Sequence, residues 1–314
     1  MTTRRPPSDR PCRLTRRRPD RRGSSLLLVL WAVMLMSFAV IGLVEHLSRG
    51  LDESVEAEKD FRARLLLESA RTLAEHPAME RGDPLLRRQV TSASSYQVRL
   101  TTEGTRLAIN QLGQNQAQRD FAERLFEQWK MPSADARTLA DSIADWIDEN
   151  DRPRRQGAER EHYAALGRHD FPFNRPFQNI NDLLLVRGAE EMDRRQPAWR
   201  QYMTLYGDGT IDVHQASSEL LEALFDVTSS EVGRFVRSRL GPDGLAESMD
   251  DPRYASLASV RSLLDVPELN YRAVAALLTL NHPIRRIECL ARAGRHERRL
   301  TLLSGAGLNV IIEE

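Results

Sequence analysis

The stretch SSLLLVLWAVMLMSFAVIGLV, residues 24–44, carries no charged side chain and decides the fold of the first part of the chain. As a helix rising about 1.5 Å per residue, the run would measure ~31 Å, the thickness of a bilayer's hydrocarbon core. It continues into Glu45 without the small-residue cleavage site of a secretory signal peptide. The sequence therefore predicts a membrane-spanning helix that stays on the protein.

A basic segment, residues 1–23, precedes this helix and ends in Gly23. It holds nine Arg and two Asp, a net charge of +7, whereas the rest of the chain has a net charge of −7. By the positive-inside rule, the segment faces the cytoplasm and the acidic body is exported. A small residue at this junction favours cleavage between Gly23 and Ser24, as in prepilin-type leaders. A signal anchor that is never cut is the alternative.

The composition limits the function classes. Affinity for a phosphate backbone needs clustered Lys and Arg, so an acidic exported body argues against nucleic acid as a partner. The two cysteines are Cys12 and Cys289, and removal of the leader excludes an intramolecular disulfide. Cys289 alternates with apolar residues and is expected to be a small buried residue. The length beyond the membrane run suffices for a sizeable core.

Past the membrane run, apolar residues recur every three or four positions up to Pro77, which predicts one continuous amphipathic helix. They are Leu47, Leu51, Val55, Phe61, Leu65, Leu66 and Leu73. Two β-favouring runs, 96–101 and 106–109, follow, and the four residues between them predict a hairpin. Strand patterns return at 286–293, 298–303 and 308–312.

Between these strand runs the pattern predicts helices and almost no strands. The expected helices are 121–129, 134–147, 180–186, 217–225, 229–240, 260–264 and 271–280. The fold class is therefore α+β, with an all-α domain inserted between the strands of a small sheet domain. The expected organisation is a leader (1–23), a transmembrane helix (24–44), a helix with the first strands (45–112), an inserted helical domain (113–281) and the last strands (282–314).

The densest polar cluster is DWIDENDRP, residues 145–153, followed by Gly157-Ala158-Glu159. Two aspartates three apart at a helix end can share one face, and the loop beyond can fold back toward them. Converging oxygen ligands of this kind suit calcium, although the EF-hand pattern is missing. The candidate ligands are Asp145, Asp148, Asn150, Asp151 and Glu159. The alternative is a solvated acidic loop neutralised by Arg152, Arg154 and Arg155.

No catalytic motif is present: the sequence has no nucleophile elbow, zinc-type cysteine pair, metalloprotease histidine pair or phosphate-binding loop. His162, His169 with Asp170, and His214 are interpreted as surface or core groups, and the protein is not expected to be an enzyme. Segments 179–188 and 259–269 each resemble a helix-hairpin-helix or SAM-like unit. Because carboxylates flank their turns, they are interpreted as packing modules, with DNA binding as the alternative.

These features together resemble the K-type minor pseudopilins (GspK family) of the type II, or general, secretion pathway, over nearly the whole chain. The resemblance is carried by the Arg22-Gly23 junction before the apolar run, by Asp145-Trp146-Ile147-Asp148 with Gly157-Ala158-Glu159 and Tyr163, by residues 180–188, and by the inserted helical block. It implies a pilin-like fold, in which a long N-terminal helix packs on a small antiparallel sheet.

The resemblance also implies a role in assembly. A prepilin peptidase would cut after Gly23, and Ser24 would be N-methylated. Most pilins have a glutamate at the fifth residue after the cut, thought to neutralise a neighbour's N-terminal amine; here that residue is Leu28. A subunit at the filament tip has nothing ahead of it to neutralise, which fits the family's inferred place at the pseudopilus tip. One departure is Asp212 to Ala216, where the family commonly shows an Asn-x-Asn-Thr-Ala run.

The expected partners are the I- and J-type minor pseudopilins, the major pseudopilin, the prepilin peptidase and the inner membrane, with no nucleic acid and no small-molecule substrate. The expected location is the inner membrane, single-pass, with the C-terminal domain in the periplasm. No cofactor is required, and calcium is the one candidate. The rival functions are a membrane-anchored DNA-binding protein and a plain anchored periplasmic interaction protein.

Overall fold

The computed structural model describes residues 22–313, so the predicted leader up to Arg21, with Cys12, lies outside the described residues. The chain divides into two compact units, one up to Glu58 and one from Lys59 onward. Helix α1 (Arg22–Glu75) begins in the first unit and ends in the second.

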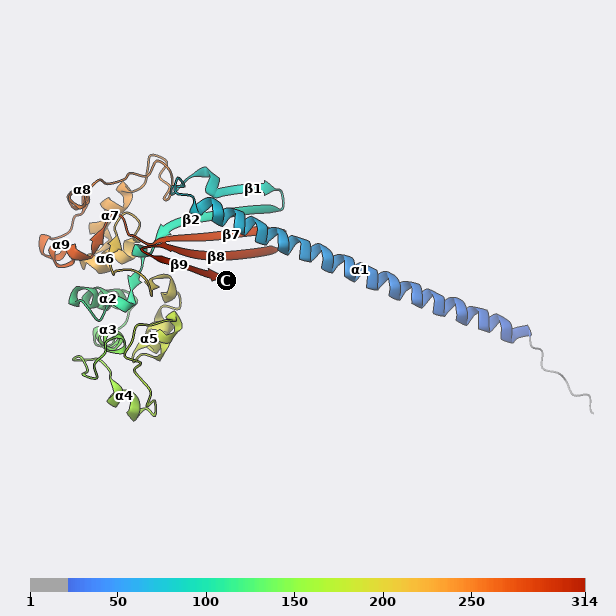
Figure 1. Ribbon diagram of the computed structural model, residues 1–314, viewed down its shortest axis with the longest axis horizontal. Helices are drawn as coiled ribbons and strands as arrows, with labels where there is room; N and C mark the ends of the chain where they lie inside the picture. The colour runs from blue at the N-terminus through green and yellow to red at the C-terminus, as the bar shows by residue number, and fades with distance from the viewer. Residues whose placement is uncertain (1–21, 314) are drawn as a thin grey trace, which may run out of the picture. The chain divides into compact units, whose positions relative to one another are not determined.

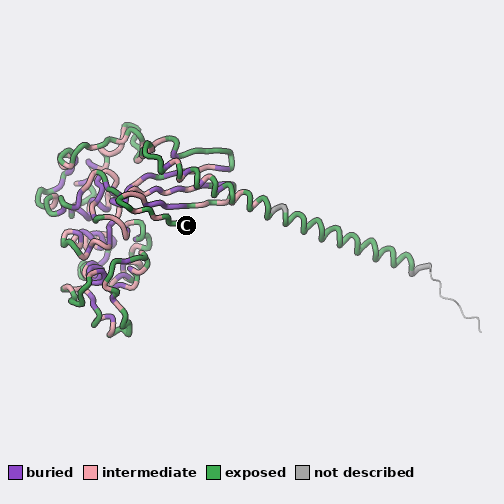
Figure 2. The backbone as a smooth tube through the Cα atoms, in the orientation of Figure 1, coloured by how far each residue is buried: buried purple, intermediate pink, exposed green. Residues whose placement is uncertain are grey.

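In the first unit, α1 is the one helix within residues 22–313 that is long and apolar enough to cross a membrane. Residues 25–50 are all exposed, as the green part of the tube in Figure 2 shows. A helix that is apolar on every side needs lipid or other apolar helices around it, as predicted for the membrane run.

The second unit contains a five-stranded antiparallel sheet in the order β1-β2-β7-β8-β9. The strands are β1 (Arg87–Thr91), β2 (Ser94–Thr102), β7 (Arg285–Ala293), β8 (His296–Gly305) and β9 (Leu308–Glu313). Strand β2 pairs with β7 along its whole length, from Ser94 opposite Ala293 to Thr102 opposite Arg285. The sheet thus joins segments far apart in the sequence, cyan beside red in Figure 1.

The last turns of α1 cover one face of this sheet mainly through small residues. Ala63, Leu67, Ala70 and Ala74 are buried, at the spacing of one helix face. The sheet contributes Val98, Leu100, Ile287, Cys289, Ala291, Leu300 and Leu302 to this core. Cys289 is buried as predicted, and burial raises the pKa of its thiol to about 12.

The apolar stripe predicted for α1 is wrong in its details, because Leu47, Val55, Phe61 and Leu65 are exposed. The residues that touch the sheet are mostly alanines, which let the helix backbone approach the strands closely. Alanine side chains are small, so they contribute little to the apolar pattern by which a buried helix face is recognised in a sequence.

The predicted hairpin of residues 96–101 with 106–109 is also wrong. Strand β2 pairs with β7 on one side and, on the other, with β1, which precedes it in the chain. Within the second run, only Leu107–Ala108 (β3) is a strand, and it pairs in parallel with β4 (Met203–Thr204). All five residues of β1 are exposed, so this edge strand lacks the apolar alternation by which strands are recognised.

Between β3 and β7 the chain forms a helical block with its own hydrophobic core. Its helices are α2 (Gln116–Gln128), α3 (Ser133–Ile147), α4 (Arg160–Ala165), α5 (Ala189–Arg195), α6 (Ser218–Phe225), α7 (Ser229–Ser238), α8 (Leu257–Leu263) and α9 (Glu268–Val274). The short 3₁₀ helices of the block are η3 (Ile109–Gln111), η4 (Ile180–Leu185), η5 (Trp199–Gln201) and η6 (Ala275–Leu277), whereas η1 (Pro84–Leu86) precedes β1 and η2 (Glu103–Thr105) follows β2. Strand β5 (Ile211–Asp212) pairs with β6 (Leu278–Thr279).

Most of the helices predicted in this block are present, with two differences. Residues 180–185 form a 3₁₀ helix, and the predicted helix 271–280 begins at Glu268 and ends in η6 and β6. Local caps fix several starts: the side chain of Asn115 accepts a hydrogen bond from Ala117 N, and that of Ser217 from Leu220 N. Helices α4 and α5 are not among the predicted helices.

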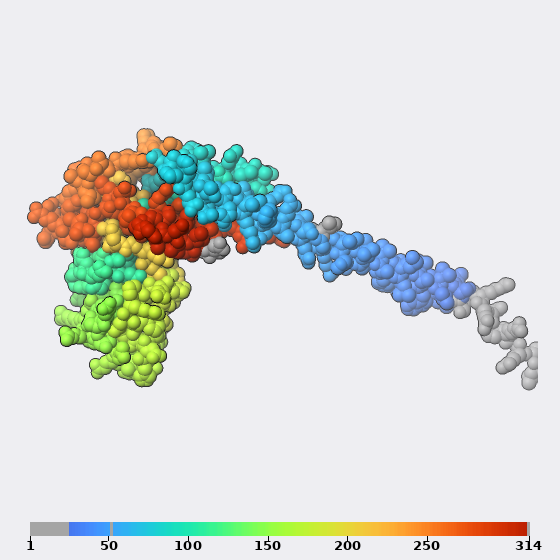
Figure 3. All heavy atoms as spheres, in the orientation of Figure 1, coloured from blue at the N-terminus to red at the C-terminus, as the bar shows by residue number. Residues whose placement is uncertain are grey.

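Buried and half-buried polar contacts fasten the block to the sheet domain. Thr102 Oγ1 donates to Asp212 Oδ2 over 3.0 Å, and Arg81 lies 2.8 Å from Asp251. Figure 3 shows the red strands against the yellow and orange part of the block. These contacts explain why the two hydrophobic cores belong to one compact unit; the domain boundaries 112/113 and 281/282 stay a prediction.

Candidate functional site

Helix α3 delivers two carboxylates to one place at its C-terminal end. Asp145 lies in the last turn and is fully buried, and Asp148 is the residue at which the chain leaves the helix. The side chain of Asp148 accepts hydrogen bonds from the backbone N (3.1 Å) and the Nδ2 (2.6 Å) of Asn150, which turn the chain into the loop that follows.

The loop then folds back over the end of α3, as predicted. The backbone N of Arg154 donates to the carboxylate of Asp145 at 3.1 and 3.2 Å, and that of Gln156 donates to Asp141 Oδ2 at 3.2 Å. Gly157 makes the close approach possible, because a Cβ at this residue would lie 1.8 Å from Asp145 Oδ2. Only glycine fits here without a shift of the carboxylate.

Arg154 supplies the positive charge of the site. Its Nη1 lies 2.6 Å from Asp145 Oδ1 and 2.5 Å from Asp148 Oδ2, and its Nη2 donates to the carbonyl oxygen of Gly113 over 3.3 Å. Of the three arginines named in the solvated-loop interpretation, Arg154 is therefore the one that neutralises these two aspartates. Its side chain is about a quarter exposed.

Glu159 is the exceptional group of the site. It is 3 % exposed, and neither carboxylate oxygen accepts a hydrogen bond from any residue that the structure describes. Burial, followed by the negative charges of Asp145 and Asp148, raises the pKa of its carboxyl to about 8. A buried carboxylate without a hydrogen-bond donor costs several kcal/mol or holds a proton, unless a cation supplies the missing charge.

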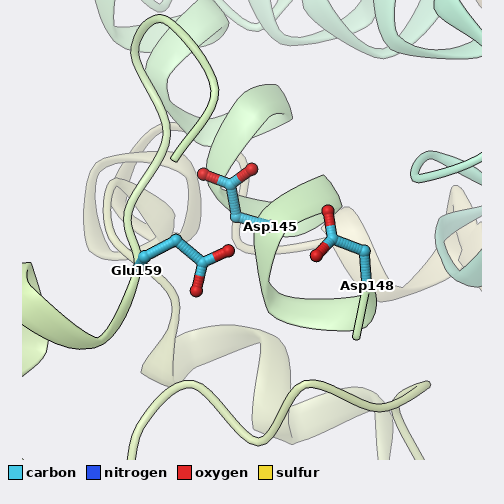
Figure 4. Close-up of side chains that lie close together, drawn as sticks. All are labelled: Asp145, Asp148 and Glu159. Atoms are coloured by element: carbon cyan, nitrogen blue, oxygen red, sulfur yellow. The ribbon is translucent and has the colours of Figure 1, made fainter. Parts of the chain in front are cut away.

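Figure 4 shows Asp145, Asp148 and Glu159 gathered at the end of α3. One carboxylate oxygen from each residue lies within 4.8 Å of the others, and no other His, Cys, Asp or Glu triad in residues 22–313 meets this condition. Oxygen ligands from a helix end and a loop are what calcium uses, with further oxygens from backbone or water. The residues present therefore fit a hard divalent cation.

The structure brings together three of the five predicted ligands and places the other two outside the triad. Asn150 is exposed and its side chain is engaged with Asp148 and with Arg152 N. Asp151 is exposed and accepts a hydrogen bond from Asn174 Nδ2 at 3.0 Å. The solvated-loop alternative does not describe Asp145 and Glu159, which are buried.

An aromatic cluster packs around Trp146 at the end of α3. Trp146, next to Asp145 in the chain, is 1 % exposed. Its ring contacts Tyr163 (5.5 Å between centroids), Phe171 (5.1 Å), Phe173 (5.4 Å) and Phe177 (6.0 Å, stacked). The Tyr163 hydroxyl accepts a hydrogen bond from Arg187 N. These rings fix the end of α3 and hence the position of both aspartates.

The remaining residues named in the sequence analysis are not members of this triad. Gly23 and Ser24 lie at the start of α1, and Leu28 is 69 % exposed on it. His169 and Asp170 are exposed, whereas His162 packs against Tyr163. His214 Nε2 accepts a hydrogen bond from Tyr254 N.

The first of the two hairpin-like units packs within the helical block. Gly188, with φ +89°, turns the chain between η4 and α5, and a Cβ there would lie 3.3 Å from the Cβ of Leu139 on α3. Leu183 and Ala189 on either side of the turn are buried. The backbone N of Arg187 donates to the Tyr163 hydroxyl and that of Ala189 to the Val186 carbonyl oxygen, so these two N–H groups are not free to bind a phosphate.

Two comparisons with known proteins found a match. Residues 105–208, which contain the acidic site, match the family model described as type II secretion system (T2SS), protein K. Among curated proteins, no sequence matches the chain. In fold, the chain is similar to a chain of the crystal structure of the GspK-GspI-GspJ complex from the enterotoxigenic Escherichia coli type 2 secretion system. The TM-score is 0.57 at 16 % identity, over 83 % of this chain and 97 % of that one.

The structural likeness, at this identity, is one of fold alone. The family match is one of sequence and lies within the helical block. The family match and the likeness in fold together support a GspK-type minor pseudopilin of the type II secretion system.

Proposed function

We propose that this chain is a non-enzymatic minor pseudopilin that acts at the tip of the pseudopilus, where it primes or caps the filament together with I- and J-type minor pseudopilins. The observation that carries the proposal is the combination of a fully exposed apolar helix with a folded body of the GspK type on the same chain. The helix anchors the protein in the inner membrane and offers its sides to other apolar helices. The periplasmic body docks on its partners.

Leu28 supports the place at the tip. It is 69 % exposed on the apolar part of α1, so this subunit offers no carboxylate there for the N-terminal amine of a neighbouring subunit. An unpaired charge in hydrocarbon costs several kcal/mol, which disfavours this chain at positions inside the filament. The partners are proposed from the matched complex, which contains GspI and GspJ.

The close packing of the Gly188 turn on Leu139 of α3 supports packing modules over the DNA-binding alternative. In this proposal the two SAM-like units, around η4–α5 and α8–α9, stabilise the helical block and do not bind a ligand. Energy for filament growth comes from other components of the machine.

The first expected result concerns processing. When the full chain is co-expressed with a prepilin peptidase and extracted from membranes, its intact mass should correspond to a chain beginning at N-methylated Ser24. A Gly23→Ala variant, which alters the residue before the cut, should retain more of the leader. An unprocessed wild-type chain of full mass under these conditions would exclude the pseudopilin proposal and favour a plain membrane-anchored protein.

We further propose that Asp145, Asp148 and Glu159 bind a divalent cation, calcium by its preference for oxygen ligands, and that the cation stabilises the block without catalysis. The supporting observation is the pair of Glu159 oxygens that have no donor among the described residues. A bound cation would supply the charge that these oxygens lack.

This proposal predicts a pH dependence. A carboxyl whose pKa is higher in the folded state, here about 8 for Glu159, stabilises the fold at low pH and loses that contribution as the pH rises. In chelator, the free energy of unfolding should therefore fall between pH 5 and pH 8, by about 2 to 5 kcal/mol. Excess calcium at pH 8 should restore about 3 kcal/mol at a concentration 100 times its Kd.

The measurement is denaturant unfolding of the full chain in detergent micelles, with and without calcium. Glu159→Gln should lose both the fall with pH and the response to calcium. Asp151→Asn is the matched control, since it removes an exposed carboxylate of the same loop, and it should keep both. Equal behaviour of the two variants would contradict the site.

A further inference from the structure

Arg154 contacts both aspartates of the candidate cation site. Its Nη1 is within 2.6 Å of one oxygen of Asp145 and of one oxygen of Asp148. Calcium binds carboxylate oxygens at 2.3–2.6 Å. A metal ion bound to Asp145 Oδ1 and Asp148 Oδ2 would therefore compete with this nitrogen for these two oxygens, at nearly the same distance.

The guanidinium leaves the charge of the cluster incompletely balanced. Asp145 and Asp148 share its one positive charge, and Glu159, the third member of the triad, makes no hydrogen bond to any described residue. A divalent cation on the triad would carry twice the charge of Arg154 and would also satisfy Glu159. The third carboxylate thus favours exchange of the arginine for a metal ion.

The exchange is sterically open. The Arg154 side chain is about a quarter exposed, so it has a route to solvent. Its backbone N also donates to Asp145, at 3.1 Å, and this contact with the loop does not depend on the guanidinium. The loop can therefore keep its fold when the side chain leaves, and the contact given up besides the aspartates is the 3.3 Å hydrogen bond to Gly113 O.

From this geometry we infer that Arg154 is an internal counter-ion that holds the site in the metal-free state and must be displaced by the metal, so that it sets the affinity of the site. The inference rests on the cation binding proposed above. It predicts a site that is ordered without metal. It also predicts that the calcium affinity is lower than that of the same three carboxylates without a competing arginine.

The test is calorimetric titration of calcium into the full chain in detergent at pH 8, for wild type, Arg154→Gln and Arg155→Gln. Arg155 is the matched control because it is the adjacent, exposed arginine and its loss changes the net charge equally. We expect Arg154→Gln to bind calcium about tenfold or more tightly than wild type, and Arg155→Gln to change the Kd much less. In chelator, Arg154→Gln should melt at a lower temperature than wild type.

Two results of the titration would overturn the inference. Weaker calcium binding by Arg154→Gln would show that the arginine supports the ligands. An equal gain in calcium affinity in both variants would show that the effect is one of general electrostatics. If neither wild type nor Arg154→Gln binds calcium, the cation site itself fails. If the variant does not fold, a second measurement, made on the wild type, still tests the inference. Modification by phenylglyoxal, followed by peptide mass spectrometry, should label Arg154 faster with calcium than in chelator, and an unchanged rate would contradict displacement.

Discussion

Replacing Glu103 with Gln is expected to lower the free energy of unfolding by about 3 to 5 kcal/mol, because it removes the shared anion of a buried charge network. Glu103 has a fully buried side chain at the start of η2. Its Oε1 lies 3.1 Å from Arg286 Nη1 and 3.5 Å from Arg106 Nη1, and its Oε2 accepts a hydrogen bond from Thr204.

The network joins the two parts of the second unit. Arg286 belongs to β7 of the sheet, and Thr204 belongs to β4 of the helical block. Without the Glu103 charge, Arg106 and Arg286 would share Glu288 alone, at 3.5 and 2.6 Å. Both arginine side chains are more than four-fifths buried, so water cannot replace the lost anion.

Denaturant unfolding of the full chain in micelles measures this effect. The matched control is Glu297→Gln, which also removes a glutamate shared by two arginines, Arg292 and Arg299. These arginines are more than half exposed, so solvent screens the pair and the change should be small. Similar losses for both variants would show that the buried network does not hold the block to the sheet.

Replacing Trp146 with Ala is expected to destabilise the protein by about 3 to 5 kcal/mol and to abolish cation binding. The side chain is 1 % exposed, and four aromatic rings surround it. The cavity left by the indole would release the end of α3, and with it the positions of Asp145 and Asp148.

Far-ultraviolet circular dichroism is the suitable probe of unfolding for this variant, because it does not depend on the deleted tryptophan. The control is Phe173→Ala, which removes another ring of the same cluster that is 39 % exposed. It should cost much less and leave calcium binding intact. A Trp146→Ala protein that keeps wild-type calcium affinity would show that the aromatic cluster does not position the aspartates.

The fold could be predicted from the sequence where one local pattern settles the structure. The uncharged run at residues 24–44 and the alternation in 286–293 are such patterns. The prediction failed where tertiary contacts decide. Strand β1 is exposed along its length, and the helix–sheet contact is made largely by alanines such as Ala70 and Ala74, which carry little pattern signal.

The candidate site, like the fold, could be predicted from the sequence only in part. The spacing of Asp145 and Asp148 near a helix end, with Glu159 downstream, was sufficient to include the triad among five candidate ligands. Nearness in sequence could not tell that Asn150 and Asp151 face elsewhere. Nor could it show that Arg154 lies between the aspartates or that Gly157 leaves room for Asp145, since both facts depend on the path of the folded loop.

The central claim, that this chain acts as a K-type minor pseudopilin, is tested most directly by complex formation. The full chain would be co-expressed with the prepilin peptidase and the I- and J-type minor pseudopilins of the same secretion system, and the extract analysed by size-exclusion chromatography with light scattering. All three proteins should elute as one complex that is lost when the I- or the J-type subunit is omitted. Elution of this chain alone, with both partners present and processed, would contradict the claim.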